Sequence, residues 1–210
     1  MQEVVQMLES DVLEKWFSEF ENALSEPDVT RIGALFHDDS HWRDVLAFSW
    51  GLQTVSGAGE IAAELSSRSP FTGAYGFRTE IFRTPPRTVT RAGRQTLEAI
   101  FGFDTKIGRG RGVLRLNQDL EGHGSLKAWT LLTALEELKG FEEQVGSRRP
   151  RGKSYSRDFH GPNWLDQRKA AAAYADRDPE VLVVGGGQAG LSIAARLIQL
   201  QVDTLIVDRN

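Results

Sequence analysis

The sequence contains no cysteine, and this absence excludes disulfides, thiolate metal sites and cysteine nucleophiles. It also lacks the basic and then apolar N-terminal stretch that marks a secretory signal. Its least charged long window, Val181–Val202, contains Arg196 and three consecutive glycines, so it is not the run of ~20 apolar residues that spans a membrane. We therefore expect a cytoplasmic protein that has no membrane partner.

The sequence has no large excess of charge of either sign. Its 25 basic and 29 acidic residues give a net charge of -4, so no nucleic-acid partner is expected. The 40% hydrophobic and 26% charged residues are typical of a globular protein. A chain of 210 residues can form one large domain or two small ones.

The first 140 residues show helical patterns followed by strand patterns. Apolar residues three and four positions apart predict a helix from Asp11 to Leu24, and shorter helices are expected at Asp28–Phe36 and at 57–68. Short segments rich in β-branched and aromatic residues then alternate with turn signals, as in "TLEAIFGFDT". This order predicts an α+β domain with helices against one side of a curved antiparallel sheet.

A polar cluster at residues 37–44, with the sequence "HDDSHWRD", is a candidate for catalysis. A histidine and an aspartate could form a general-base pair. In a regular strand, however, His41 and Asp44 point to opposite faces. Metal binding by His37 and His41 would require a continuous helix, which is not expected here. We interpret the cluster as a turn followed by the start of the sheet, and we predict no metal site.

Two short basic segments could bind anions. "GRGRG", Gly108–Gly112, could hold a phosphate, but between two strands it is more simply interpreted as a hairpin turn with solvated charges. "RRPRGK", Arg148–Lys153, lies in a segment of linker composition. We assign a function to neither.

The pattern from "VLEKWFSEFENAL" to "KAWTLLTALEELKG" resembles the SnoaL-like fold, also called nuclear transport factor 2-like, over residues 1–140. The resemblance implies a cone-shaped α+β domain with a pocket between its helices and its sheet. Some members of that group are isomerases or dehydratases, and many only bind or pack. The resemblance is also compatible with a homodimer formed through this domain.

Residues 141–178 have the composition of a linker, with a helix expected at about 163–177. Asn163 is suited to cap that helix, and Pro179 to end it. The remaining segment, 179–210, reads as the start of a separate domain.

This last segment contains a dinucleotide fingerprint. Val181–Val184 predict a buried parallel strand, and Gly185, Gly187 and Gly190 satisfy G-x-G-x-x-G before an amphipathic helix and a second strand. Asp208 follows Gly190 by 18 residues, near the spacing of ~20 at which an acidic side chain meets the adenosine ribose. We expect a Rossmann-type βαβ unit that binds FAD or NAD rather than NADP.

The stretch "DPEVLVVGGGQAGLSIAARLIQLQVDTLIVDRN" resembles the N-terminal FAD-binding unit of flavin-containing monooxygenases, and the whole chain is similar to members with a preceding SnoaL-like domain. The resemblance implies that the three glycines hold the FAD pyrophosphate and that Asp208 holds its ribose. It implies oxygenation of a small organic substrate with NADPH as reductant. Gln201 departs from the helix-ending glycine of many relatives.

No second fingerprint for NADPH occurs in the sequence. We therefore expect the N-terminal part of a truncated enzyme that is inactive alone and whose catalytic residues lie in the missing part. Two alternatives remain: an autonomous SnoaL-like isomerase or dehydratase, and a non-catalytic module for ligand binding or dimerisation.

Overall fold

A computed structural model describes residues 2–80, 84–118, 125–149 and 161–209. The chain divides into two compact units, Met1–Lys139 and Gly140–Asn210. Each unit is described by itself.

The first unit has three helices, α1 (Gln2–Ser25), α2 (Val29–Ala34) and α3 (Ala58–Thr72). Helix α1 begins well before the predicted start at Asp11. Helix α2 begins where predicted, because the Asp28 carboxylate accepts hydrogen bonds from the amides of Thr30 and Arg31 at 2.8 and 3.1 Å. Helix α3 continues through Pro70 and ends at Gly73, whose φ of +54° suits glycine.

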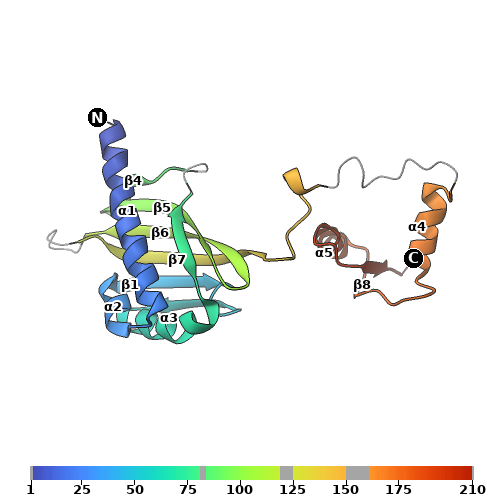
Figure 1. The fold of residues 1–210 in the computed structure, drawn as a ribbon, viewed down its shortest axis with the longest axis horizontal. Coiled ribbons are helices and arrows are strands. Elements are labelled where there is room, and N and C mark those ends of the chain that lie inside the picture. The colour runs from blue at the N-terminus through green and yellow to red at the C-terminus, as the bar shows by residue number, and fades with distance from the viewer. Residues whose placement is uncertain (1, 81–83, 119–124, 150–160, 210) are drawn as a thin grey trace. The chain divides into compact units, whose positions relative to one another are not determined.

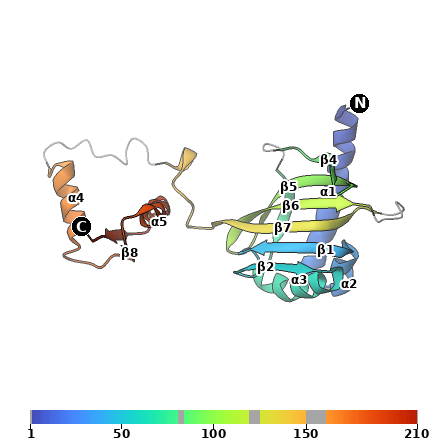
Figure 2. The ribbon, with the colours of Figure 1, turned by 180° about the vertical axis from the view of Figure 1, so that it is seen from behind.

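Seven strands form one curved sheet in the order β2-β1-β7-β6-β5-β3, with β4 also paired to β5. The helices lie on one face of this sheet, and the opposite face carries none of them (Figures 1 and 2). The strands are β1 (Phe36–Val45), β2 (Leu52–Ser56), β3 (Tyr75–Thr79), β4 (Arg87–Arg91), β5 (Arg94–Asp104), β6 (Gly108–Asn117) and β7 (Lys127–Leu138).

The sheet is mixed, and the prediction of a purely antiparallel sheet was wrong in this respect. Strands β1 and β7 are parallel, whereas β5, β6 and β7 form the expected antiparallel meander. The parallel pair joins the first strand to the last one of this unit, so no hairpin connects them. Local sequence patterns could not predict this pairing, because the two strands lie far apart in the sequence.

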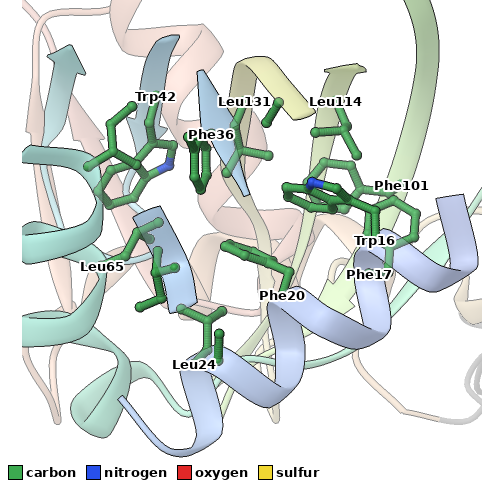
Figure 3. Packing of buried hydrophobic residues seen from close by; sticks show 14 of the residues in the cluster. Trp16, Phe17, Phe20, Leu24, Phe36, Trp42, Leu65, Phe101, Leu114 and Leu131 are labelled. Atoms are coloured by element: carbon green, nitrogen blue, oxygen red, sulfur yellow. The ribbon is translucent and has the colours of Figure 1, made fainter. Parts of the chain in front are cut away.

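The core of the first unit is filled with aromatic rings (Figure 3). Trp16, Phe17 and Phe20 of α1 pack against rings of the sheet, among them Phe36 and Phe101. The centroids of Trp16 and Phe20 lie 4.8 Å apart in a stacked arrangement. These rings fill the space between α1 and the middle of the sheet in the described residues.

The segment Gly108–Gly112 lies inside β6, so its prediction as a hairpin turn was wrong. A Cβ on Gly110 would overlap the ring of Phe103, and one on Gly112 would overlap the ring of Phe101 and the carbonyl oxygen of Leu132. These glycines make room for aromatic rings of the neighbouring strand. Sequence spacing alone could not show this contact, because the rings come from β5.

The second unit contains a short 3-10 turn (Gly146–Arg148), α4 (Trp164–Ala173), β8 (Val181–Val184), α5 (Gln188–Gln199) and β9 (Thr204–Val207). Helix α4 is capped by Asn163, which accepts a hydrogen bond from the amide of Asp166 at 3.0 Å. The basic run that begins at Arg148 lies outside the described residues from position 150 onward. Among the described residues, no helix is both long and apolar enough to cross a membrane.

Candidate functional site

The fingerprint glycines lie in the loop between β8 and α5. Gly185 has a φ of +107°, which favours glycine, and its amide donates to the carbonyl oxygen of Val207 at 2.7 Å. Gly187 stands immediately before α5, and a Cβ built on it would meet no atom within 4 Å. The backbone at the start of α5 is therefore open to a ligand, and the first amides of a helix have no partner within the helix.

Gly190 lies where α5 crosses the first strand. A Cβ at this position would overlap the carbonyl oxygen of Gly185 and would lie 3.3 Å from a methyl group of Val183. Only glycine allows the helix to approach the strand this closely. The backbone thus places the positive end of the helix dipole at the glycine loop, where it favours an anion.

Asp208 follows β9 and lies next to the same loop. Strands β8 and β9 are parallel, with Val184 opposite Val207, so the residues after both strands meet at one edge. A Cβ on Gly186 would lie 2.9 Å from Oδ2 of Asp208. The structure therefore brings the glycine loop and Asp208 together, and it adds Gly186, which the fingerprint leaves unspecified.

The two strands of this unit are incompletely covered. Val183 and Ala194 are buried, but Leu182 is 54% exposed and Val184 80% exposed. Parallel strands are normally covered on both faces. Among the described residues, no element covers these apolar side chains of β8.

The polar cluster at residues 37–44 does not form one site. His37 Nε2 donates to the carbonyl oxygen of Asn117 at 2.9 Å, whereas His41 Nδ1 lies 2.8 Å from the Ser56 hydroxyl oxygen. His41 is exposed and Asp44 is fully buried, as the strand alternation predicts. The histidine and the aspartate therefore do not form a general-base pair.

Asp44 has a structural role instead. Its carboxylate accepts hydrogen bonds from the amide of Ser49 at 2.8 Å, the hydroxyl of Ser49 at 2.6 Å and the hydroxyl of Thr133 at 2.6 Å. The hydroxyl oxygen of Thr133 in turn accepts from the indole nitrogen of Trp42 at 2.9 Å. This network ties the loop after β1 to β7, and it satisfies the buried charge with donors.

Two hollows open at the rim of the first unit and share Leu126. We name the larger one the Lys15 hollow and the smaller one the Asn117 hollow. The Lys15 hollow has a volume of about 560 Å³, and the residues around it are Val12, Lys15, Trp16, Glu19, Arg31, Ala34, Leu35, Ser125, Leu126 and Lys127. The Asn117 hollow has about 400 Å³ and is surrounded by Thr88, Arg94, Gln95, Leu97, Asn117, Gln118 and Leu126.

Glu98 is surrounded by three arginines and is only 8% exposed. Its carboxylate accepts from Arg87 at 2.9 Å, from Arg91 at 3.2 Å and from Arg115 at 2.8 Å. Burial raises the pKa of Glu98, but the hydrogen bonds from Arg91, Arg115 and Arg87 outweigh burial and lower the pKa to about 2. Sequence patterns carry no signal for this cluster, because its members come from the three strands β4, β5 and β6.

A second unpredicted cluster joins the end of α4 to the start of β9. Asp203 accepts from the Tyr174 hydroxyl at 2.7 Å and from Nε of Arg177 at 3.0 Å. The hydrogen bond to Asp203 raises the pKa of Tyr174, and the hydrogen bonds from Tyr174 and Arg177 lower the pKa of Asp203. The contacts fasten the segment before β8 to the βαβ unit.

Gln201 adopts a backbone conformation that glycine adopts more readily than other residues. Its φ is +62°, in the left-handed region. The departure from glycine is therefore accommodated in the turn between α5 and β9.

No protein-family model and no curated protein matches the chain. Similar solved structures include a domain of unknown function with a cystatin-like fold from Nostoc punctiforme, with 13% identity and a TM-score of 0.46 over 77% of this chain and 91% of that chain. Another is a protein of unknown function with a cystatin-like fold from Methylobium petroleophilum, with 16% identity and a TM-score of 0.39 over 68% and 97% of the two chains.

A third similar structure is described as the beta subunit of an aromatic-ring-hydroxylating dioxygenase from Novosphingobium aromaticivorans. It shares 11% identity at a TM-score of 0.42, over 63% of this chain and 92% of that chain. At such identities and scores, the description of the fold rests on the helices and the curved mixed sheet of the first unit itself.

Proposed function

We propose that the second unit binds the adenosine diphosphate half of FAD, and that the chain acts in an FAD- and NADPH-dependent monooxygenase that transfers one atom of O2 to an organic substrate. The observation that carries this proposal is the close approach at Gly190. A Cβ there would overlap the carbonyl oxygen of Gly185, so glycine allows α5 to begin close against the loop. Asp208 lies beside that loop.

The residues present fit this group. The amides at Gly187 and the following turn of α5 would hold the diphosphate, as the open backbone and the helix dipole favour. Asp208 would accept hydrogen bonds from the adenosine ribose hydroxyls, and its negative charge would repel a 2′-phosphate. FAD, when bound, would supply the electron transfer that oxygenation requires. No residue of this chain is assigned to catalysis or to NADPH.

The exposed apolar strand residues support a larger flavin-binding domain. Leu182 and Val184 of β8 would be covered if further strands and helices of such a domain packed against this pair. In this proposal β8, α5 and β9 would form the beginning of the adenine-side half of such a sheet, and we expect only weak binding of FAD to the chain by itself.

Equilibrium dialysis of the full chain against FAD and FMN tests the proposal. FMN carries the same isoalloxazine ring but lacks the diphosphate and the adenosine, so we expect retention of FAD and at least about fivefold weaker retention of FMN. An Asp208→Asn variant should reduce FAD retention and leave FMN retention unchanged. Equal retention of the two flavins would refute the proposal.

A second candidate function is a SnoaL-like ligand-binding module or isomerase in the first unit, and the Lys15 hollow favours it. The hollow has apolar walls and three cations, of which Lys15 lies 4.0 Å from Glu19 and Arg31 lies 3.9 Å from Glu26. Lys127 is the remaining cation of the lining, and together with the apolar walls it suits an apolar molecule with a negative charge. Titration with 2-naphthoate should shift the indole N–H signal of Trp16 in the full chain. A Lys127→Glu variant should weaken that shift, and an unmoved Trp16 signal would argue against this candidate.

A further inference from the structure

Three arginines of the first unit share the carboxylate of Glu98. They are Arg87 and Arg91 of β4 and Arg115 of β6, and among the described residues none of them pairs with another acid. Three positive charges against one negative charge leave an excess of two positive charges in one place. Burial raises the pKa of Glu98, yet the arginines lower it to about 2, as a strongly positive surrounding requires. An anion that joined the cluster would reduce the repulsion among the arginines.

Two of these guanidinium groups are open to solvent and have hydrogen-bond donors to spare. The side chain of Arg87 is 53% exposed and that of Arg115 is 35% exposed, whereas that of Glu98 is only 10% exposed. A guanidinium carries five N–H donors. Among the described residues, Arg87 uses one of them for Glu98, and so does Arg115. Both groups therefore have donors left for an anion that arrives from solvent.

Glu98 holds the two guanidinium groups in place. In the ladder of strands β4, β5 and β6, Arg87 stands opposite Glu98 on one side and Arg115 stands opposite it on the other. Arg87 donates to Oε1 at 2.9 Å, and Nε of Arg115 donates to Oε2 at 2.8 Å. The two groups thus converge on one carboxylate from opposite sides. Because they are already ordered, an anion that binds both of them does not have to order two long side chains.

An apolar pair adjoins the arginines on the same face of the sheet. Ile100 follows Glu98 by two residues and stands opposite Val113, so both side chains lie on the face that carries Glu98. This is the face without helices, because the alternate residue Phe101 packs against α1 on the other side (Figures 1 and 2). Both apolar side chains face one small hollow together with Arg87 and Arg115. A ligand with an anionic group and a small apolar group would contact both kinds of residue.

We propose that Arg87 and Arg115 bind a phosphate group, either free or as a small phosphate monoester, on the face of the sheet opposite the helices. The charge of a phosphate monoester at neutral pH, close to two negative charges, matches the excess of two positive charges. Its three terminal oxygens accept hydrogen bonds in several directions, so they can bridge two guanidinium groups. A singly charged oxyanion would leave one positive charge of the cluster uncompensated.

Phenyl phosphate is a suitable probe, and benzenesulfonate is its matched control because it has the same ring and a tetrahedral oxyanion but only one negative charge. In titrations of the 15N-labelled full chain at pH 7.5 and constant ionic strength, phenyl phosphate should shift the Nε–H signal of Arg115 saturably. Benzenesulfonate should bind at least about fivefold more weakly. Inorganic phosphate distinguishes the two sources of the group. Binding of phenyl phosphate that is at least about threefold tighter than that of inorganic phosphate indicates an ester whose apolar part contacts Ile100 and Val113, and equal binding indicates free phosphate.

Three variants separate a site from general attraction to surface charge. Arg115→Gln and Arg87→Gln should each weaken phenyl phosphate binding by at least about fivefold, measured by the Nε–H signal of Arg91. Arg43→Gln is the control. Arg43 lies on the same face of the sheet, is exposed, and donates to the Thr54 hydroxyl at 2.8 Å, and among the described residues it pairs with no acid. Removing this single cation should leave the affinity unchanged within about twofold.

Three results would overturn the proposal: an Arg115 signal that phenyl phosphate does not shift, equal affinities for phenyl phosphate and benzenesulfonate, or equal weakening by Arg43→Gln and Arg115→Gln. If Arg115→Gln does not fold, the more exposed Arg87 and the comparison of the two probes on the unaltered chain decide the question. The inference is independent of the FAD proposal, since the reporting arginines lie in the first unit and a phosphate at the glycine loop would shift amides of the second unit instead.

Discussion

Replacing Glu98 with glutamine should destabilise the first unit in a way that depends on pH. The carboxylate is nearly buried and receives hydrogen bonds from three arginines, which lower its pKa from 4.5 to about 2. A shift of that size corresponds to about 3 kcal/mol at 1.36 kcal/mol per pKa unit. Because the arginines are partly exposed and solvent screens them, we expect a loss of roughly 2 kcal/mol at pH 7.

The sign follows from the lowered pKa. The stabilisation by Glu98 is present above the unfolded pKa of 4.5 and disappears as the pH falls through the folded value of about 2. The loss caused by Glu98→Gln should therefore be largest at neutral pH, and less than about half of it should remain at pH 3. If the arginines contributed nothing, the loss of unfolding free energy caused by Glu98→Gln would be the same at pH 7 and at pH 3.

Urea unfolding of the full chain, followed by tryptophan fluorescence at pH 7, 5 and 3, measures this effect. Trp16 and Trp42 are buried in the core of the first unit and report its unfolding, whereas Trp164 of the second unit is exposed. Glu136→Gln is the control, because this half-exposed carboxylate pairs with Arg111 alone at the surface and should cost less than about 1 kcal/mol. A loss below about 0.5 kcal/mol at pH 7, or an equal loss at pH 7 and pH 3, would refute the reasoning.

Three further outcomes are expected. Gly190→Ala should destabilise the βαβ unit by about 1–3 kcal/mol because its Cβ would overlap the Gly185 carbonyl oxygen, and hydrogen exchange at the amides of β8 measures this. Gly112→Ala should cost the first unit about 1–3 kcal/mol in urea unfolding through overlap with Phe101, whereas Gly59→Ala, with open space around its Cβ, should not destabilise it. The purified chain should show no stoichiometric flavin absorbance, because the proposed FAD site would have exposed strands on the described residues; a 1:1 flavin spectrum would contradict this.

The features that the sequence predicts well are those whose causes lie close together along the chain. The helix that begins after Asp28 is set by its own cap, and the alternation of His41 and Asp44 follows from strand geometry. For these features the sequence alone was sufficient.

The features that were missed depend on residues far apart in the sequence. The glycines of β6 looked like a turn because the rings of Phe101 and Phe103 that require them belong to β5. The parallel contact of β1 with β7 and the cluster around Glu98 have the same origin. The buried amide of Asn117 has no signature in the sequence, because only the packing shows that no described residue forms a hydrogen bond with it.

The most direct test of the FAD proposal is an NMR titration of the 15N-labelled full chain with ADP. The backbone amides of Gly187, Gln188 and Ala189 should shift saturably, and ADP that carries an additional 2′-phosphate should bind more weakly because of Asp208. Gly187→Val should abolish the shifts without lowering the Tm, since a Cβ there meets no atom within 4 Å. Amides of this loop that stay unmoved by ADP, or that respond equally in Gly187→Val, would contradict the proposal.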